Sequence, residues 1–195
     1  LSWLVPVGIS FFSLQAISYV VDVYRGTAPA ERNFAKFALY LAFFPKLISG
    51  PLERIGHLLP QLLNPNPLAY QTLVNSCVRI GWGFFKKNII ADRMGVAVKT
   101  IFDNPAAFQS PTLLFGVLAF GLQIYLDFSA YTDIALGTAK ILGIDLVENF
   151  DKPYFATSVT DFWRRWHLSL SNWLRDYIFL PLTFRTRRAR SAWVG

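Results

Sequence analysis

A segment near the end of the chain gathers acidic, basic, aromatic and hydroxyl side chains within about three helical turns. Its sequence is DFWRRWHLSLS, residues 161–171. If this segment is helical, the four-residue spacing places Asp161 over Arg165 and His167 over Ser171. So many polar groups are costly inside an apolar protein unless they pair or face water, and they therefore predict a functional cavity.

His167 is the candidate general base of this segment. An unperturbed imidazole titrates near neutral pH and can take a proton from a hydroxyl group. Arg164 and Arg165 are candidate substrate-binding residues, because a guanidinium donates two parallel hydrogen bonds to a phosphate or a carboxylate. Asp161 is a candidate of the same site, as a residue that binds substrate or supports the arginines. The alternative roles are structural: a histidine satisfied by a helix neighbour, and arginines that pair with carboxylates or lipid phosphates.

A second polar row lies in an apolar stretch of the chain. Gln123, Asp127 and Tyr131 are four residues apart, so on a helix they form one stripe. We interpret Asp127 and Tyr131 as substrate-binding residues that line a tunnel; the alternative is a set of hydrogen bonds between helices. For His57 we expect no polar partner at helical spacing and a structural role.

Other kinds of chemistry lack their motifs in this sequence. There is no Gly-x-Ser-x-Gly nucleophile elbow, no phosphate loop of the Walker type, no cysteine pair and no His-x-x-x-His pair. We therefore expect no bound metal. The single cysteine, Cys77, lies in an apolar stretch where thiols are inert, so we expect no cysteine nucleophile.

The elements that position these residues are predicted to be membrane-embedded helices. Of the 195 residues, 53% are hydrophobic and only 16% are charged, against about 25% charged in soluble domains. Residues 1–21 and 104–126 carry no charge, and about 20 apolar residues let a helix cross a bilayer. The predicted fold class is all-α, a polytopic transmembrane helical bundle. The net charge of +7 would also suit nucleic acid, but no binding motif is present and we expect no such partner.

The pattern along the chain predicts four segments before the polar row: a spanning helix over 3–21, a short or re-entrant helix over 34–48, a connecting segment over 53–70, and a helix over 73–91 whose basic side chains reach toward headgroups. The apolar run 112–126 continues past Asp127 to Asp133. Both carboxylates therefore lie near membrane depth unless the helix breaks. Four arginines within 185–190 predict a cytoplasmic loop.

Several motifs, in order, resemble those of the membrane-bound O-acyltransferase family, and together they cover nearly the whole chain. They are VGISFF (7–12), QAISY (15–19), VDVYRG (21–26), FPKLISGP (44–51), GFFKK (83–87), YLDFSAYTD (125–133), ENF (148–150) and DFWRRWH (161–167). The branch that the chain resembles includes bacterial alginate O-acetyltransferase and the D-alanyl transfer protein of teichoic acid synthesis. One departure is Thr183-Phe184, where relatives tend to have paired glycines.

This resemblance implies a multi-pass protein of the bacterial inner membrane, in which a tunnel carries an acyl group from a cytoplasmic thioester to a hydroxyl on the other face. The donor, acetyl-coenzyme A or an acyl carrier protein, would be a substrate, and no cofactor would be bound. The implied acceptor is an exported polysaccharide such as alginate, and the implied partners are membrane lipid and a periplasmic acyltransferase. Residues 1–195 would be the central part of one membrane domain, truncated at both ends.

His167 matches one of two histidines in the family's motifs, and the resemblance implies that the second, more strictly required one follows it several tens of residues downstream, after Gly195. We therefore expect the fragment alone to be inactive. Direct transfer from a thioester needs a base and a cavity without water, but no protein nucleophile. Two other functions stay open: a secondary transporter that binds an ion or proton at Asp127 and Asp133, and a membrane scaffold for a periplasmic enzyme.

Overall fold

The computed structural model describes residues 8–184, and all regular structure within this range is helical. The all-α prediction is therefore confirmed for the described residues. The chain folds as two compact units. The first combines Leu1–Pro65 with Ile144–Gly195, and the second is Asn66–Gly143. The prediction of a single membrane domain concerns the whole protein and stays a prediction.

The first unit begins with helices α1 (Ile9–Tyr24) and α2 (Phe34–Ala42), the 3₁₀ turn η1 (Phe44–Lys46) and helix α3 (Ile55–Leu63). Helix α2 contacts both α1 and α3. Its start is fixed by Asn33, whose side-chain oxygen accepts the Ala35 N–H at 2.9 Å. Tyr40 of α2 and Leu58 of α3 are fully buried and form part of the core of this unit.

The short helix predicted over 34–48 is confirmed as α2 followed by η1. The connecting segment predicted over 53–70 is wrong in part, because α3 occupies nine of its residues and contains Pro60. Pro60 has no N–H to donate to the Gly56 carbonyl oxygen, so α3 lacks one backbone hydrogen bond in its second turn.

The second part of the first unit contains the 3₁₀ turn η4 (Pro153–Phe155), helices α7 (Val159–Trp163) and α8 (Leu168–Leu174), and the π-helical turn η5 (Arg175–Phe179). Ser158 is the N-cap of α7, and its hydroxyl accepts the Asp161 N–H at 3.1 Å. The single helix expected from Asp161 onward is wrong. The chain leaves the helix after α7 and re-enters it after His167, whose backbone has the left-handed φ of 44°.

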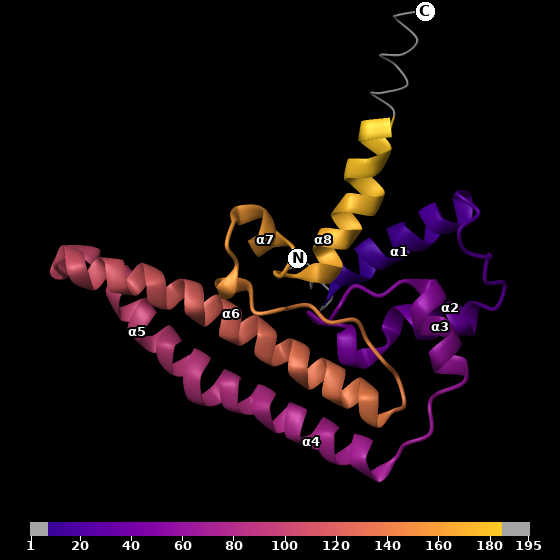
Figure 1. Ribbon diagram of the computed structural model, residues 1–195, viewed down its shortest axis with the longest axis horizontal. Helices are drawn as coiled ribbons and strands as arrows, with labels where there is room; N and C mark the ends of the chain where they lie inside the picture. Colours follow the sequence, from indigo (N-terminus) through magenta and orange to yellow (C-terminus); the bar gives the residue numbers. More distant parts are fainter. Residues whose placement is uncertain (1–7, 185–195) are drawn as a thin grey trace, which may run out of the picture. The chain divides into compact units, whose positions relative to one another are not determined.

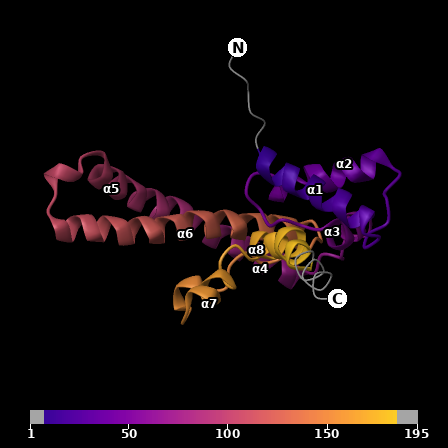
Figure 2. The same ribbon diagram turned by 90° about the horizontal axis from the view of Figure 1, so that it is seen from above.

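The second unit is a helical hairpin made of α4 (Tyr70–Phe84), the π-helical segment η2 (Phe85–Ala91), α5 (Asp92–Asp103), the 3₁₀ turn η3 (Pro105–Ala107) and α6 (Ser110–Ile141). Figures 1 and 2 show α4 and α5 following one another along the length of α6. Glycines permit a close approach: a Cβ on Gly137 would lie 2.9 Å from the Ser76 carbonyl oxygen, and one on Gly83 would lie 2.8 Å from that of Ala130.

Among the described residues, α6 is the one helix long and apolar enough to cross a membrane, and α1 is an apolar helix of 16 residues. The 32 residues of α6 correspond to about 48 Å at 1.5 Å per residue. Its first half exposes large apolar side chains such as Leu114 and Leu118. Such a surface suits lipid better than water. The predicted arginine cluster, within 185–190, lies outside the described residues.

Candidate functional site

His167 stands at the turn between α7 and α8, as the N-cap residue of α8. The carbonyl oxygen of Asn149 accepts the N–H of Leu168 at 2.9 Å, which fixes the start of α8. The His167 ring lies 6.4 Å from the ring of Phe11, between centroids, and its Nε2 atom is shielded from solvent. A left-handed backbone is unfavourable for a residue with a Cβ, so the surroundings must hold His167 in place.

Burial lowers the pKa of His167 from its ordinary value near 6.5 to about 4. The imidazole is therefore neutral at pH 7 and can accept a hydrogen bond or a proton. A proton taken onto this ring would be held weakly, because the imidazolium would be poorly solvated. The environment suits a group that orients a hydroxyl more than a strong base acting alone.

Asp161 and Arg165 are paired as the sequence predicted. Nε of Arg165 lies 3.0 Å from both carboxylate oxygens of Asp161, and this hydrogen bond holds the pKa of Asp161 below its ordinary value. The Arg165 carbonyl oxygen also accepts the Asp151 N–H at 2.9 Å. Arg164, by contrast, is exposed. Arg164 is therefore the more exposed of the two arginines, whereas Arg165 pairs with Asp161.

The expected stacking of His167 over Ser171 is made by the backbone and not by the side chains. The Ser171 N–H donates to the His167 carbonyl oxygen at 3.0 Å, and the Ser171 hydroxyl donates to the Trp166 carbonyl oxygen at 3.2 Å. The reason is the break in the helix, which turns the His167 side chain away from the position that a continuous helix would give it.

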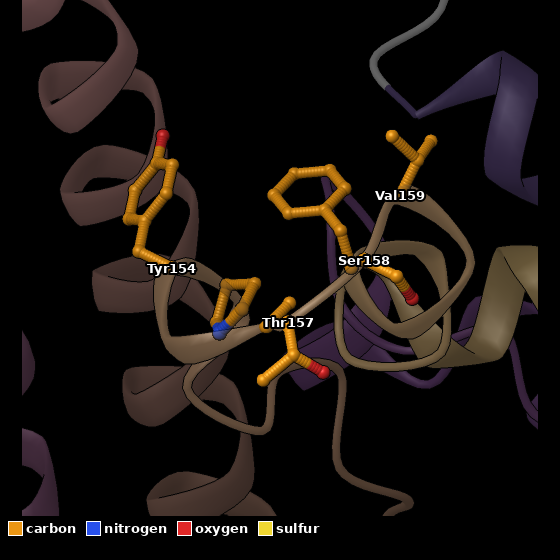
Figure 3. Close-up of a pocket in the computed structure, with 7 residues that line it drawn as sticks. Tyr154, Thr157, Ser158 and Val159 are labelled. Carbon is orange, nitrogen blue, oxygen red and sulfur yellow. The ribbon is translucent and has the colours of Figure 1, made fainter.

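Aromatic residues adjoin Asp161 and Arg165 in the sequence, and their rings contact one another. The ring of Phe162 stacks on Trp166 with centroids 5.5 Å apart, and Tyr154 lies 6.2 Å from Phe162. Beside them is an open pocket of about 390 Å³, which Tyr154 and Val159 flank on either side in Figure 3, with Thr157 between them. An apolar wall with a few hydroxyls is typical of a site that receives a small organic ligand.

A buried hydrogen-bond chain holds α8 against the preceding segments. The Leu52 N–H donates to the Ser169 hydroxyl at 2.9 Å, and that hydroxyl donates to Oδ1 of Asn149 at 2.6 Å. Asn149 is fully buried, and its Nδ2 makes no hydrogen bond within the described part of the chain. Asn149 lies in the motif ENF and Ser169 in the segment 161–171, but the sequence predicted no role for either, because this contact joins residues 20 apart in the chain.

The polar row of the second unit lies on α6, which does not break between Asp127 and Asp133. Lys87 reaches Asp127 at 2.6 Å. Asp133 binds Lys86 at 2.6 Å and Arg79 at 3.0 Å. The expectation that these basic side chains reach toward headgroups is therefore wrong: they pair with carboxylates of α6.

The π-helical geometry of η2 explains how two adjacent lysines can both face α6. A π-helix has more residues per turn than an α-helix, so neighbouring side chains diverge less around the axis. Lys86 is largely buried and also donates to the Ser129 hydroxyl at 2.9 Å. Tyr131, one turn beyond Asp127 on α6, is partly buried.

His57 has a partner that the sequence reading missed. Its Nδ1 lies 2.6 Å from Oε2 of Glu53, four residues earlier, and Gln61 follows four residues later. The expectation of no polar partner at helical spacing is therefore wrong. The four-residue spacing of Glu53 and His57 is visible in the sequence, but the nearby prolines predicted a loop here and not a helix.

The residues proposed for chemistry thus fall in both units. Asp161, Arg164, Arg165 and His167 belong to the first, while Asp127 and Tyr131 belong to the second. Their catalytic and substrate-binding roles stay predictions. Within the described residues, no cluster of three or more histidine, cysteine or acidic side chains is arranged to hold a metal ion.

Comparison with known proteins places the chain in a family. It is 44% identical to a probable alginate O-acetylase of Pseudomonas putida, over 95% of this chain and 39% of that protein. It is 33% identical to a peptidoglycan O-acetyltransferase of Helicobacter pylori and 31% identical to a teichoic acid D-alanyltransferase of Bacillus subtilis, over 92% and 91% of this chain and 39% and 45% of those proteins.

The chain therefore spans about two fifths of the length of these relatives. A family match covers residues 28–194, which include α2 to α8 and the whole of the second unit. The motifs that suggested the resemblance lie within the same span, apart from those in and before α1. The chain belongs to the membrane-bound O-acyltransferase family.

Proposed function

We propose that this chain is part of an O-acyltransferase of the bacterial inner membrane, which moves an acyl group, most simply acetyl, from a cytoplasmic thioester to a hydroxyl of an exported polysaccharide. Family membership and the names of three kinds of relatives support this proposal, since all three transfer an acyl group to a cell-surface polymer. The high identity to alginate O-acetylases favours alginate among possible acceptors.

The observation that carries the proposal within this chain is the conformation of His167. A non-glycine residue in the left-handed region is uncommon, and such strain concentrates at functional sites. His167 also combines this backbone with a shielded Nε2 and a neutral ring. The hydrogen bond from the Leu168 N–H to the Asn149 carbonyl oxygen fixes the start of α8 and so the position of His167. A group that must meet a hydroxyl requires such a rigid support.

The reaction needs little from the protein beyond positioning and proton transfer. The acceptor oxygen attacks the thioester carbonyl carbon, the carbon–sulfur bond breaks, and the thiolate takes up a proton equivalent to the one that the hydroxyl loses. We propose that neutral His167 accepts the hydrogen bond from this hydroxyl and orients it. A second histidine in the rest of the protein would then receive the proton, because the low pKa of His167 disfavours holding it.

The membrane location fits the same scheme. We propose that α6 spans the bilayer as one of several helices of the full protein, with its uncharged first half in the hydrocarbon region. The surrounding lipid would keep water away from the thioester, because water would hydrolyse it. A periplasmic acyltransferase that receives or directs the acyl group is the partner proposed for the outer face.

The test is acyl transfer by the full-length protein in membrane vesicles supplied with a radiolabelled acyl donor. We expect His167→Ala to lower transfer by a factor of about 10², the size of effect that follows when a reacting group is misplaced by about 1 Å. Asn75→Ala, an exposed position on α4, serves as the matched control and should leave transfer unchanged.

Three outcomes would contradict the proposal. Transfer by His167→Ala at the control rate would remove the role of His167. Solute uptake that does not depend on the donor would favour the transporter. Loss of a complex with a periplasmic enzyme, without any transfer by the intact protein, would favour a scaffold.

A further inference from the structure

A second imidazole of this chain is oriented by a buried carboxylate. The Glu53 side chain is fully enclosed, and its Oε1 accepts the Val147 N–H at 2.6 Å while Oε2 contacts Nδ1 of His57 at 2.6 Å. The Glu53 carbonyl oxygen also accepts the Tyr40 hydroxyl at 2.8 Å. A carboxylate removed from water needs such partners, so both its position and that of His57 are fixed.

This contact decides which nitrogen of His57 carries the proton. A carboxylate only accepts, so Nδ1 of the neutral ring must be the donor and Nε2 the acceptor. The amide nitrogen of Gln61 lies 3.4 Å from Nε2, but it donates at shorter range to the carbonyl oxygens of His57, at 3.0 Å, and Asp145, at 3.1 Å. The His57 side chain is 46% exposed and lines a pocket, so a ligand can reach the imidazole.

His57 and Glu53 line a small pocket of about 120 Å³. At roughly 30 Å³ for each water-sized group, this volume holds about four non-hydrogen atoms. The walls combine apolar and polar groups, and they also come from Leu52, Arg54, Val147, Glu148, Ser169 and Asn172. A ligand that enters it would be a small polar molecule, or the polar end of a larger one.

The charges around the pocket select the class of ligand. The Arg54 guanidinium donates to the Asp176 carboxylate at 2.7 Å and to the Tyr177 hydroxyl, so Asp176 already compensates its charge. The carboxylates of Glu53 and Glu148 repel one. The Ser169 hydroxyl is committed to Asn149, whereas exposed Asn172 offers both a donor and an acceptor. A neutral group that both donates and accepts hydrogen bonds satisfies these walls.

We propose that the pocket beside the Glu53–His57 pair is a binding site for a vicinal diol, such as one edge of a sugar ring. One hydroxyl donates to Nε2 of His57, and the neighbouring hydroxyl pairs with the Asn172 amide. Glu53 is the positioning residue that holds His57 in the accepting tautomer. This site does not depend on the acyl transfer proposed for His167, and its test measures binding alone.

The experiment uses the full-length protein in nanodiscs with ¹³Cε1-labelled histidine, and ethane-1,2-diol as the probe. The resonance of His57 is identified by its loss in His57→Gln. We expect that resonance to move in a saturable way as the diol is added, because the diol binds to the neighbouring Nε2 atom. Sodium acetate at the same concentrations should not move it.

Two amide variants form a matched pair in this experiment. Asn172→Leu removes an exposed amide from the pocket wall, and the diol concentration at half-saturation should rise about two- to tenfold, as for one lost hydrogen bond. Asn75→Leu removes an exposed amide that lines no part of the pocket and should leave the titration unchanged.

The proposal is overturned if the diol does not move the His57 resonance, or if acetate moves it equally, which would indicate an anion site. It is also overturned if Asn172→Leu and Asn75→Leu titrate alike. All three results can be read whether or not His167→Ala retains acyl transfer, so the two proposals fail separately.

Discussion

Replacing Asp133 by leucine should destabilise the hairpin of α4 and α6 by about 3 kcal/mol. Removing one partner of a buried ion pair costs about 3–5 kcal/mol, because the other charge stays buried without compensation. The Lys86 side chain is 10% exposed and cannot reach water without leaving its site. The estimate lies at the lower end of this range because Lys86 keeps the Ser129 hydroxyl, and because Arg79, 35% exposed, can turn to solvent.

The measurement is equilibrium unfolding of the full-length protein in mixed micelles, with sodium dodecyl sulfate as denaturant and far-ultraviolet circular dichroism as the signal. A change of about 3 kcal/mol corresponds to roughly two powers of ten in the unfolding equilibrium. Lys86→Met serves as the second single variant. In the double variant no charge is left unpaired between these two positions, so its stability should return to within about 1 kcal/mol of the original protein.

Two results would refute this reasoning. Unfolding of Asp133→Leu at the same denaturant fraction as the original protein would mean that Lys86 does not rely on this carboxylate. A double variant as labile as Asp133→Leu would mean that the loss comes from altered packing and not from an uncompensated charge.

Two further predictions concern buried or strained side chains of the first unit. Burial lowers the pKa of Lys46 from near 10.5 to about 7, so between these pH values the unfolded chain binds more protons than the folded chain, and stability rises with pH. Lys46→Met should flatten that rise in thermal unfolding measured from pH 7 to pH 10. An unchanged slope would contradict this prediction. His167→Gly should be more stable than His167→Ala by about 1 kcal/mol in the same assay, because glycine adopts a φ of 44° without strain. Equal stability of the two variants would show that the backbone at residue 167 stores no strain.

The sequence predicted the helical class and the helix that carries Asp127 and Asp133, because both follow from composition and from a long apolar run. It also predicted the Asp161–Arg165 pair, whose four-residue spacing depends only on local geometry. The break at His167 was not predictable in this way. Histidine has no strong preference for the left-handed region, and only the tertiary hydrogen bond between Asn149 and Leu168 shows why the chain turns there.

The missed partners share a second physical cause. Arg79, Lys86 and Lys87 lie in an apolar helix, where long basic side chains commonly extend to headgroups, and nothing local indicates that carboxylates 40 or more residues later will meet them. Contacts between distant segments are set by packing and not by spacing. The Glu53–His57 pair is the opposite case, since its spacing was visible and only the assignment of a loop concealed it.

The π-helical turns of η2 determine how the second unit responds to changes in chain length. Each residue added to or removed from a helix rotates everything beyond it by about 100°. A one-residue deletion between Lys86 and Gly95 would rotate α5 around its axis. It would also put a bulkier residue at the place of Gly95, where the Gln123 side chain approaches closely. This stretch can therefore exchange side chains far more readily than it can change its number of residues.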